Sequence, residues 1–209
     1  MAASVNQIAG LEEAIGALRA GDLVVYPTET FYGIAADPFS ATALEKLFAI
    51  KGRDANKPIA LIAADSAMAF AIAREVPAIA RRLAIAFWPG PLTMVIPARR
   101  DFRAQLIGPD GGVGVRVSSH PVARALSRGL GHPITATSAN LSGEAPATTI
   151  GAARKSLGSK VKVFLEGGAL TATSPSTVIA CDEDSFRIIR TGAISERELT
   201  AALSAGTST

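Results

Sequence analysis

Along most of the chain, apolar residues recur at helical spacing or in short runs, and turn-forming residues separate these segments. In the first segment one helical face carries Ile8, Leu11, Ile15 and Leu18, with Asn6 as candidate N-cap and Gly21 as stop signal. Further helices are predicted after Ser40 and over residues 66–74, 77–87, 121–130, 149–157 and 196–203. Strands are predicted over residues 23–26, 59–63, 92–97, 113–117, around 134, and over 161–165, 177–180 and 186–189.

The order of these elements predicts one α/β domain over residues 1–209, built on a large twisted sheet flanked by helices. Some strands are joined by short turns and others by helices. Short turns give antiparallel pairs, whereas helical crossovers give parallel pairs, so we expect a mixed sheet. The hydrophobic content of 48% is ample for a sizeable core.

Three polar stretches between the apolar segments are candidates for a ligand site. Residues 27–33 follow the end of a strand, where open α/β sheets bind their ligands. Lys51 and Arg53, at the end of the second helix, offer a point charge and a planar fork for phosphate oxygens. Ser138 and Asn140 follow another strand and supply neutral donors and acceptors. Together these groups suit a nucleotide.

Each stretch also has a plain structural explanation. Cations are favoured at helix C-termini, which is enough to account for Lys51 and Arg53. Ser138 and Asn140 are typical of a turn or a helix cap, and residues 28–30 suit an exposed turn. The density of hydroxyl and amide side chains over residues 135–142 favours a ligand-binding loop.

Two arginines need an anionic partner or an exposed position. Arg116 alternates with Val115 and Val117 in a predicted strand, which points its guanidinium away from the valine face. Arg190 follows the strand 186–189 and precedes the turn-forming Gly192.

Composition narrows the possible functions. The single cysteine, Cys181, excludes an intramolecular disulfide, and the two histidines make a transition-metal enzyme improbable. No apolar run spans a bilayer and no secretory signal begins the chain, so we expect a cytoplasmic protein without membrane contact. The net charge of +3 permits an anionic ligand or weak contact with RNA.

Familiar catalytic motifs are absent from the sequence. It has no Gly-x-Ser-x-Gly elbow, no Gly-x-x-x-x-Gly-Lys-Ser/Thr phosphate loop and no Gly-x-Gly-x-x-Gly fingerprint. The remaining cationic and neutral polar groups suit positioning and charge stabilisation at a phosphate better than covalent catalysis.

Six motifs in this order give the chain a close resemblance to the threonylcarbamoyl-AMP synthases of the YrdC-like family, in their short, single-domain form. The resemblance extends from about residue 21 to residue 194. The motifs are Tyr26-Pro27-Thr28-Glu29-Thr30-Phe31-Tyr32-Gly33, Lys51-Gly52-Arg53, Trp88-Pro89-Gly90-Pro91-Leu92-Thr93, Val113-Gly114-Val115-Arg116, Ser138-Ala139-Asn140 and Ser176-Thr177-Val178.

The resemblance implies a concave, positively charged pocket and a nucleotidyl transfer. L-threonine, bicarbonate and ATP would give L-threonylcarbamoyladenylate and pyrophosphate. The product would pass to proteins that transfer the threonylcarbamoyl group to tRNA, next to the anticodon. Mg²⁺ would be bound through the ATP phosphates, with no metal site of the protein's own.

Site roles follow from the resemblance position by position. Lys51 and Arg53 would be catalytic and would neutralise the triphosphate. Thr28, Arg116 and Ser176 would bind threonine, with Arg116 on its carboxylate. The remaining positions of the ATP site would be Ser138, Asn140, Pro146 and Arg190.

The chain departs from the family pattern at four positions, and two other functions stay open. The departures are Asp54, Ile62, Pro146 and Thr191, where the family usually has other residues. One alternative is a carbamoyl-adenylate-forming domain of the hydrogenase-maturation type, although such proteins carry cysteine-rich zinc motifs. The other alternative is a non-catalytic RNA-binding module, which the low charge density and few aromatic residues disfavour.

Overall fold

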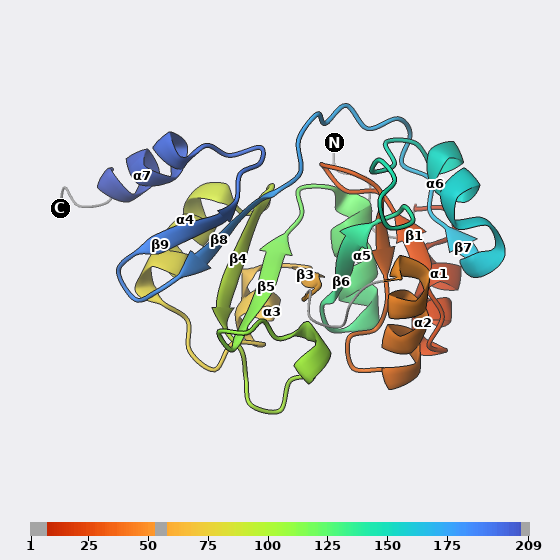
Figure 1. Ribbon diagram of the computed structural model, residues 1–209, viewed down its shortest axis with the longest axis horizontal. Helices are drawn as coiled ribbons and strands as arrows, with labels where there is room; N and C mark the ends of the chain where they lie inside the picture. The colour runs from red at the N-terminus through yellow and green to blue at the C-terminus, as the bar shows by residue number, and fades with distance from the viewer. Residues whose placement is uncertain (1–7, 53–57, 206–209) are drawn as a thin grey trace.

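One mixed sheet runs through the protein in the computed structural model, which describes residues 8–52 and 58–205 (Figure 1). Its strands are β1 (Val24–Tyr26), β2 (Gly33–Ala35), β3 (Ala60–Ala63), β4 (Leu92–Pro97), β5 (Gly112–Val117), β6 (Ile134–Ser138), β7 (Val163–Phe164), β8 (Thr177–Cys181) and β9 (Phe186–Arg190). Their order is β7-β1-β2-β6-β3-β5-β4-β8-β9. The pairs β1–β7, β3–β5 and β4–β8 are parallel and the other neighbours antiparallel, so the predicted mixed sheet is confirmed.

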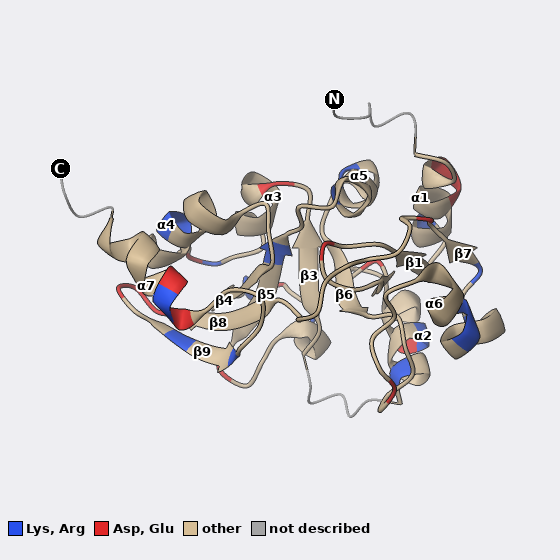
Figure 2. Ribbon diagram, turned by 90° about the horizontal axis from the view of Figure 1, so that it is seen from above, with Lys and Arg blue, Asp and Glu red and all other residues tan. Residues whose placement is uncertain are grey.

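Helices cover both sides of this sheet. They are α1 (Leu11–Arg19), α2 (Ala41–Lys51), α3 (Ser66–Phe70), α4 (Ala78–Phe87), α5 (Pro121–Leu130), α6 (Ile150–Leu157) and α7 (Glu196–Ser204), with short 3₁₀ helices at Ala104–Leu106 and Gly158–Lys160. Figure 2 shows α3, α4 and α5 on one side of the strands and α2 on the other. In Figure 1, α1, α2, α5 and α6 surround one end of the sheet, while α4 and α7 lie at the other end.

Helix starts show where local sequence controls the fold. Ser40 caps α2 as predicted, because its Oγ accepts a hydrogen bond from Ala43 N at 3.2 Å. The first helix begins later than predicted, at Leu11, since Gly10 adopts φ 78°, a left-handed conformation that a helix cannot contain. The predicted cap Asn6 lies outside the described residues.

Two elements differ from the sequence prediction. Strand β2 was not predicted, because its three residues are too few to show alternation and a polar loop precedes them. The predicted helix 66–74 ends at Phe70, and Ala73 instead forms an isolated bridge with Ala98. The backbone of this segment therefore pairs with the end of β4.

Two apolar clusters form the core. The smaller one packs α1 and α5 together and against β1 and β6, with Leu18, Val24, Leu126 and Ile134 fully or nearly fully buried. The larger one packs α2, α3, α4, α6 and α7 against residues of β1, β2, β3, β4, β5 and β8. Val24 of β1 belongs to the smaller cluster and its neighbour Val25 to the larger one, so the two clusters cover opposite faces of the sheet where they share strands.

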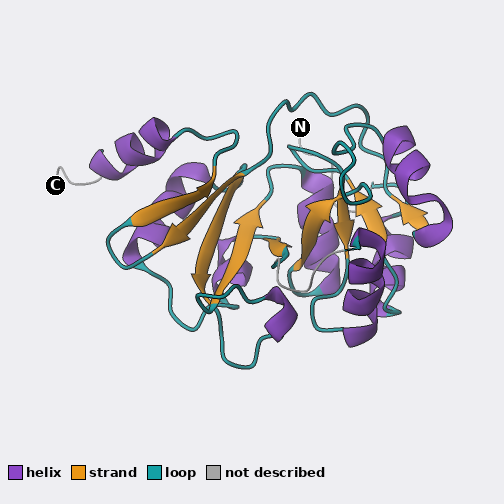
Figure 3. Cartoon of the chain, in the orientation of Figure 1, coloured by secondary structure: helices purple, strands orange, loops and turns teal. Residues whose placement is uncertain are grey.

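The connection from β7 to β8 crosses the top of the molecule as a long loop, seen in teal in Figure 3. Tyr32 anchors the start of this loop, since its hydroxyl donates to Gly168 O at 2.8 Å and accepts from Gly167 N at 3.0 Å. The end of the loop contacts the turn after β9, where Ala193 N donates to Pro175 O at 2.9 Å. The loop delivers Ser176 to the start of β8.

Gly192 allows this last contact, because a Cβ there would lie 2.3 Å from Pro175 O and 2.5 Å from Ser176 C. We expect Gly192→Ala to displace this backbone and to lower the free energy of unfolding by about 1–3 kcal/mol, measured by urea denaturation. The control is Gly16→Ala on the exposed face of α1, where nothing lies within 4 Å of the new Cβ. That change should raise stability by about 0.5–1 kcal/mol. A neutral Gly192→Ala would contradict the close approach.

Candidate functional site

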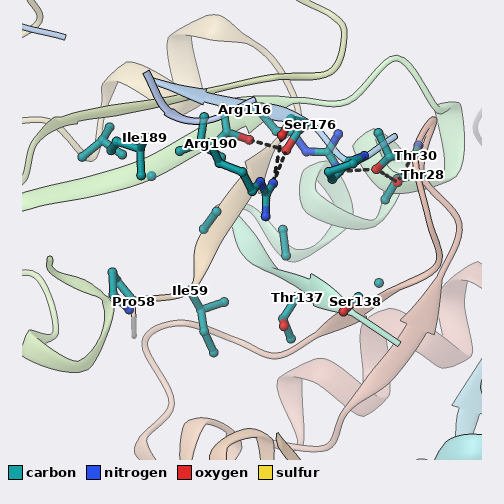
Figure 4. Close-up of a pocket in the computed structure, with 18 of the residues that line it drawn as sticks. Thr28, Thr30, Pro58, Ile59, Arg116, Thr137, Ser138, Ser176, Ile189 and Arg190 are labelled. Atoms are coloured by element: carbon teal, nitrogen blue, oxygen red, sulfur yellow. Dashed lines mark hydrogen bonds between the residues drawn. The ribbon is translucent and has the colours of Figure 1, made fainter. Parts of the chain in front are cut away.

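A cavity of about 800 Å³ opens over the middle of the sheet. Figure 4 shows its two facing sides: Thr28, Thr30, Arg116, Ser176, Ile189 and Arg190 lie on one, and Pro58, Ile59, Thr137 and Ser138 lie on the other. The central strands contribute residues from their interior as well as from their ends, and the loops after β1 and before β8 complete the wall. Segments far apart in the sequence therefore meet around one space.

The cavity has room because small side chains occupy the central strands. Ala60, Gly114 and Ala136 line it from three adjacent strands, and Thr93 lines it from β4. A Cβ at Gly114 would lie 3.4 Å from Ala60 Cβ and 3.5 Å from Thr93 Cγ2. Larger side chains on these strands would fill the cavity from its floor.

The loop after β1 presents a chain of hydroxyl groups to the cavity. Thr28 and Thr30 are buried, and their Oγ1 atoms lie 3.0 Å apart. Thr28 Oγ1 also donates to Phe31 O at 2.7 Å, which holds the loop in its bend. The polar stretch at residues 27–33 is thus an ordered wall of the cavity.

Arg116 lies on β5 with only 7% of its side chain exposed. Its Nη1 forms an ion pair with Glu29 Oε1, and its Nη2 lies 3.4 Å from Thr30 Oγ1. The prediction that Arg116 has either an anionic partner or an exposed position is confirmed. The partner is Glu29, which could not be identified from the sequence. The second carboxylate oxygen of Glu29 accepts from Ser118 Oγ.

Ser176 joins the same side of the cavity through two contacts. Its hydroxyl lies 3.0 Å from Thr93 Oγ1, and Arg190 Nη2 donates to its Oγ at 3.1 Å and to its carbonyl at 2.9 Å. Arg190 is the last residue of β9, where it lies opposite Val178 of β8. Ser176 is a predicted threonine-binding residue and Arg190 a predicted ATP-binding residue, and the two are in direct contact.

Lys51 contacts the loop after β6. Its side chain is buried, and its Nζ donates to Ser138 O at 3.0 Å and to Asn140 O at 2.6 Å, with Asn140 Oδ1 at 3.4 Å. Ser138 lines the cavity, whereas Lys51 and Asn140 are not among its lining residues in the described structure. The contact of Lys51 with phosphate stays a prediction. Arg53 lies outside the described residues.

Several lining residues were not singled out from the sequence as site residues. Three of them are Thr93, which belongs to a quoted motif but was given no role, and Arg187 and Ile189 of β9. The predicted ATP-site residue Pro146 also lines the cavity. Arg187 Nη2 lies 3.6 Å from Asp110 Oδ2, and both residues are at the exposed rim. Side chains alternate between the two faces of a strand, so Arg187 and Ile189 are expected on the same face of β9. The sequence does not show which face of β9 borders the cavity.

Burial shifts the pKa values of two groups beside the site. It raises the pKa of Tyr26, whose hydroxyl donates to Thr135 O at 2.9 Å, so this phenol stays neutral. It also lowers the pKa of His120, and nearby Arg124 lowers it further while Glu29 acts in the opposite direction. His120 Nδ1 accepts from Val122 N at 3.3 Å at the start of α5, which also requires the neutral ring.

The part of the chain that the structure describes contains neither a cluster of metal-ligand side chains nor a helix that could span a membrane. There, no three His, Cys, Asp or Glu side chains gather as metal ligands. No helix among the described residues has the length and apolar character that a bilayer crossing requires. Burial raises the pKa of the Cys181 thiol to about 12, so it is protonated.

Comparison with known proteins identifies the family to which the sequence and fold belong. Residues 16–192 match the sequence model of the Sua5/YciO/YrdC family, whose description is "Telomere recombination". The chain belongs to this family, as its match over most of its length shows.

Among its relatives, the threonylcarbamoyl-AMP synthase of Vibrio cholerae is 38% identical over 187 residues, which cover 88% of this chain and 98% of that protein. The threonylcarbamoyl-AMP synthase of Thiobacillus denitrificans is 41% identical over 162 residues, covering 78% and 86% respectively. The crystal structure of P. abyssi Sua5 complexed with L-threonine superposes with a TM-score of 0.88 at 33% identity. That match covers 92% of this chain and 57% of the longer Sua5 chain.

The contacts of Lys51 generate a prediction about stability. Lys51→Met keeps the apolar stem but removes the donor to two backbone carbonyls, so we expect a loss of about 1–3 kcal/mol in the free energy of unfolding, measured in urea. The matched control on the same helix is Lys46→Met. Lys46 binds Gly21 O and Asp22 with 43% of its side chain exposed, and its loss should cost less than about 1 kcal/mol. Equal losses would contradict a structural role for Lys51.

Proposed function

We propose that the protein is an ATP-dependent synthase that converts L-threonine, bicarbonate and ATP to L-threonylcarbamoyladenylate and pyrophosphate. Its product would serve threonylcarbamoyl transfer to tRNA. The observation that carries the proposal is the gathering of Thr28, Arg116 and Ser176 on one side of a cavity in a chain that belongs to this family. The names of its relatives and the threonine in P. abyssi Sua5 support the same reaction.

The proposed chemistry has two steps. The amino group of threonine condenses with bicarbonate to form a carbamate and water. A carbamate oxygen then attacks the α-phosphorus of ATP, and pyrophosphate leaves with the electrons of the broken P–O bond. Both steps need reactants held in line and negative charge offset more than they need a protein nucleophile.

The residues have separate roles in this proposal. Arg116 binds the threonine carboxylate, and Thr28 and Ser176 bind the other polar groups of the amino acid. Ser138, Asn140, Pro146 and Arg190 form the nucleotide site, with Lys51 and Arg53 as its catalytic cations. The support for this division is partial: Ser138, Pro146 and Arg190 line the same cavity, whereas Lys51 reaches that site through the loop it binds.

Mg²⁺ belongs to the proposal as a companion of ATP. The described residues offer no cluster of carboxylates for a bound ion, and the cavity wall carries Asp110 as its one described carboxylate. This donor set fits an ion that takes its ligands from phosphate and water. Bound in this way, Mg²⁺ would offset charge on the departing pyrophosphate.

The activity can be tested with the purified chain. We expect labelled bicarbonate to appear in an adenylate, with stoichiometric pyrophosphate, only when both ATP and threonine are present. Carbamoyl phosphate serves as the alternative co-substrate, and adenylate formed from it would favour a carbamoyl-adenylate-forming domain instead. No adenylate from either, with measurable affinity for RNA, would favour a binding module. Chromatographic analysis of the nucleotide products separates these outcomes.

The division of the cavity predicts a selective effect at Arg116. Arg116→Ala removes the charged fork for the threonine carboxylate, so we expect the KM for threonine to rise about 100-fold or more, while the KM for ATP changes less than about threefold. The control is Arg99→Ala, an exposed arginine paired with Asp101 outside the cavity lining, which should change neither value. Equal rises in both KM values for Arg116→Ala would contradict the assignment.

A further inference from the structure

Glu29 joins two parts of the sheet that are not neighbours. It lies in the loop between β1 and β2, whereas Arg116 lies on β5, and β6 and β3 separate β2 from β5 in the strand order. The loop therefore reaches past the ends of two strands to bring its carboxylate to Arg116. The two residues are 87 positions apart in the chain.

Both carboxylate oxygens of Glu29 have partners. Oε1 accepts from Arg116 Nη1, and Oε2 accepts from Ser118 Oγ. Ser118 is fully buried, and its Oγ accepts from His120 N at 3.1 Å, which directs the hydroxyl hydrogen toward Glu29. The carboxylate is thus fixed from two sides, with 13% of its side chain exposed.

The pair fixes the plane of the guanidinium as well. Nη1 is engaged by Glu29, so the planar group cannot rotate without breaking a buried ion pair. Nη2 lies 3.4 Å from Thr30 Oγ1, which itself lies 3.0 Å from Thr28 Oγ1 on the cavity wall. The orientation of Arg116 relative to the cavity is therefore set by Glu29.

We infer that Glu29 is a positioning residue for the amino-acid substrate: it holds the guanidinium of Arg116 in the orientation that receives the substrate carboxylate. This inference rests on the proposed function, in which Arg116 binds that carboxylate. Recognition of a carboxylate by an arginine depends on the direction of its N–H groups as well as on charge. An arginine free to rotate would keep the charge and lose the direction.

The test compares steady-state kinetics of Glu29→Gln, Arg116→Ala and the double variant. Glu29→Gln keeps the shape of the side chain and removes its charge. We expect the KM for threonine to rise about tenfold, with the KM for ATP within about twofold and kcat within about threefold. In the Arg116→Ala background, Glu29→Gln should add no further rise, because the group it positions is gone. Glu13→Gln, an exposed carboxylate on α1, is the matched control and should leave all three values unchanged.

Ser118→Ala keeps the variant series informative if Glu29→Gln does not fold. It removes one partner of the carboxylate without removing charge, and we expect a smaller rise, about threefold, confined to threonine. Proportional losses for both substrates, or a Glu29→Gln effect that persists undiminished without Arg116, would overturn the positioning role. A wild-type chain that forms no threonine-dependent adenylate would instead overturn the proposed function, and the inference with it.

Discussion

The ion pair between Glu29 and Arg116 is the interaction on which the candidate site depends. A guanidinium with 7% of its side chain exposed is costly to bury without a partner, and the partner here comes from the other part of the sheet. Satisfying this charge forces the loop after β1 to lie across the ends of β6 and β3. Thr28 and Thr30 reach the cavity wall because their loop carries Glu29 to that place.

The cavity also depends on what the strands beneath it lack. Ala60, Gly114 and Ala136 present little or no side chain on three adjacent strands, so the loops can enclose space above them. Buried polar groups that line such a space need hydrogen-bond partners. In the described part of the chain, no buried side-chain nitrogen or oxygen lacks a hydrogen-bond partner. The buried polar groups of the wall are therefore held by other groups of the protein.

Local features were predictable from the sequence and long-range pairings were not. Most helices and strands could be predicted from signals that act within a few residues. These signals are the apolar periodicity, helix caps such as Ser40 and the helix stop at Gly21. The start of α1 depends on the backbone conformation of Gly10, and β2 on its pairing with β1 and β6. Alternation correctly turned Arg116 away from the valines, but the identity of its partner depends on how the sheet is ordered.

Lys51 is a second residue whose contacts could not be predicted from the sequence. Its position at a helix end suggested a cation for phosphate, and the structure gives its Nζ to the carbonyls of Ser138 and Asn140. Through this contact Lys51 holds the loop whose Ser138 lines the cavity. In the proposed function, Lys51 therefore acts on the nucleotide side by shaping this loop, and the proposed amino-acid side with Glu29 and Arg116 lies across the cavity from Ser138.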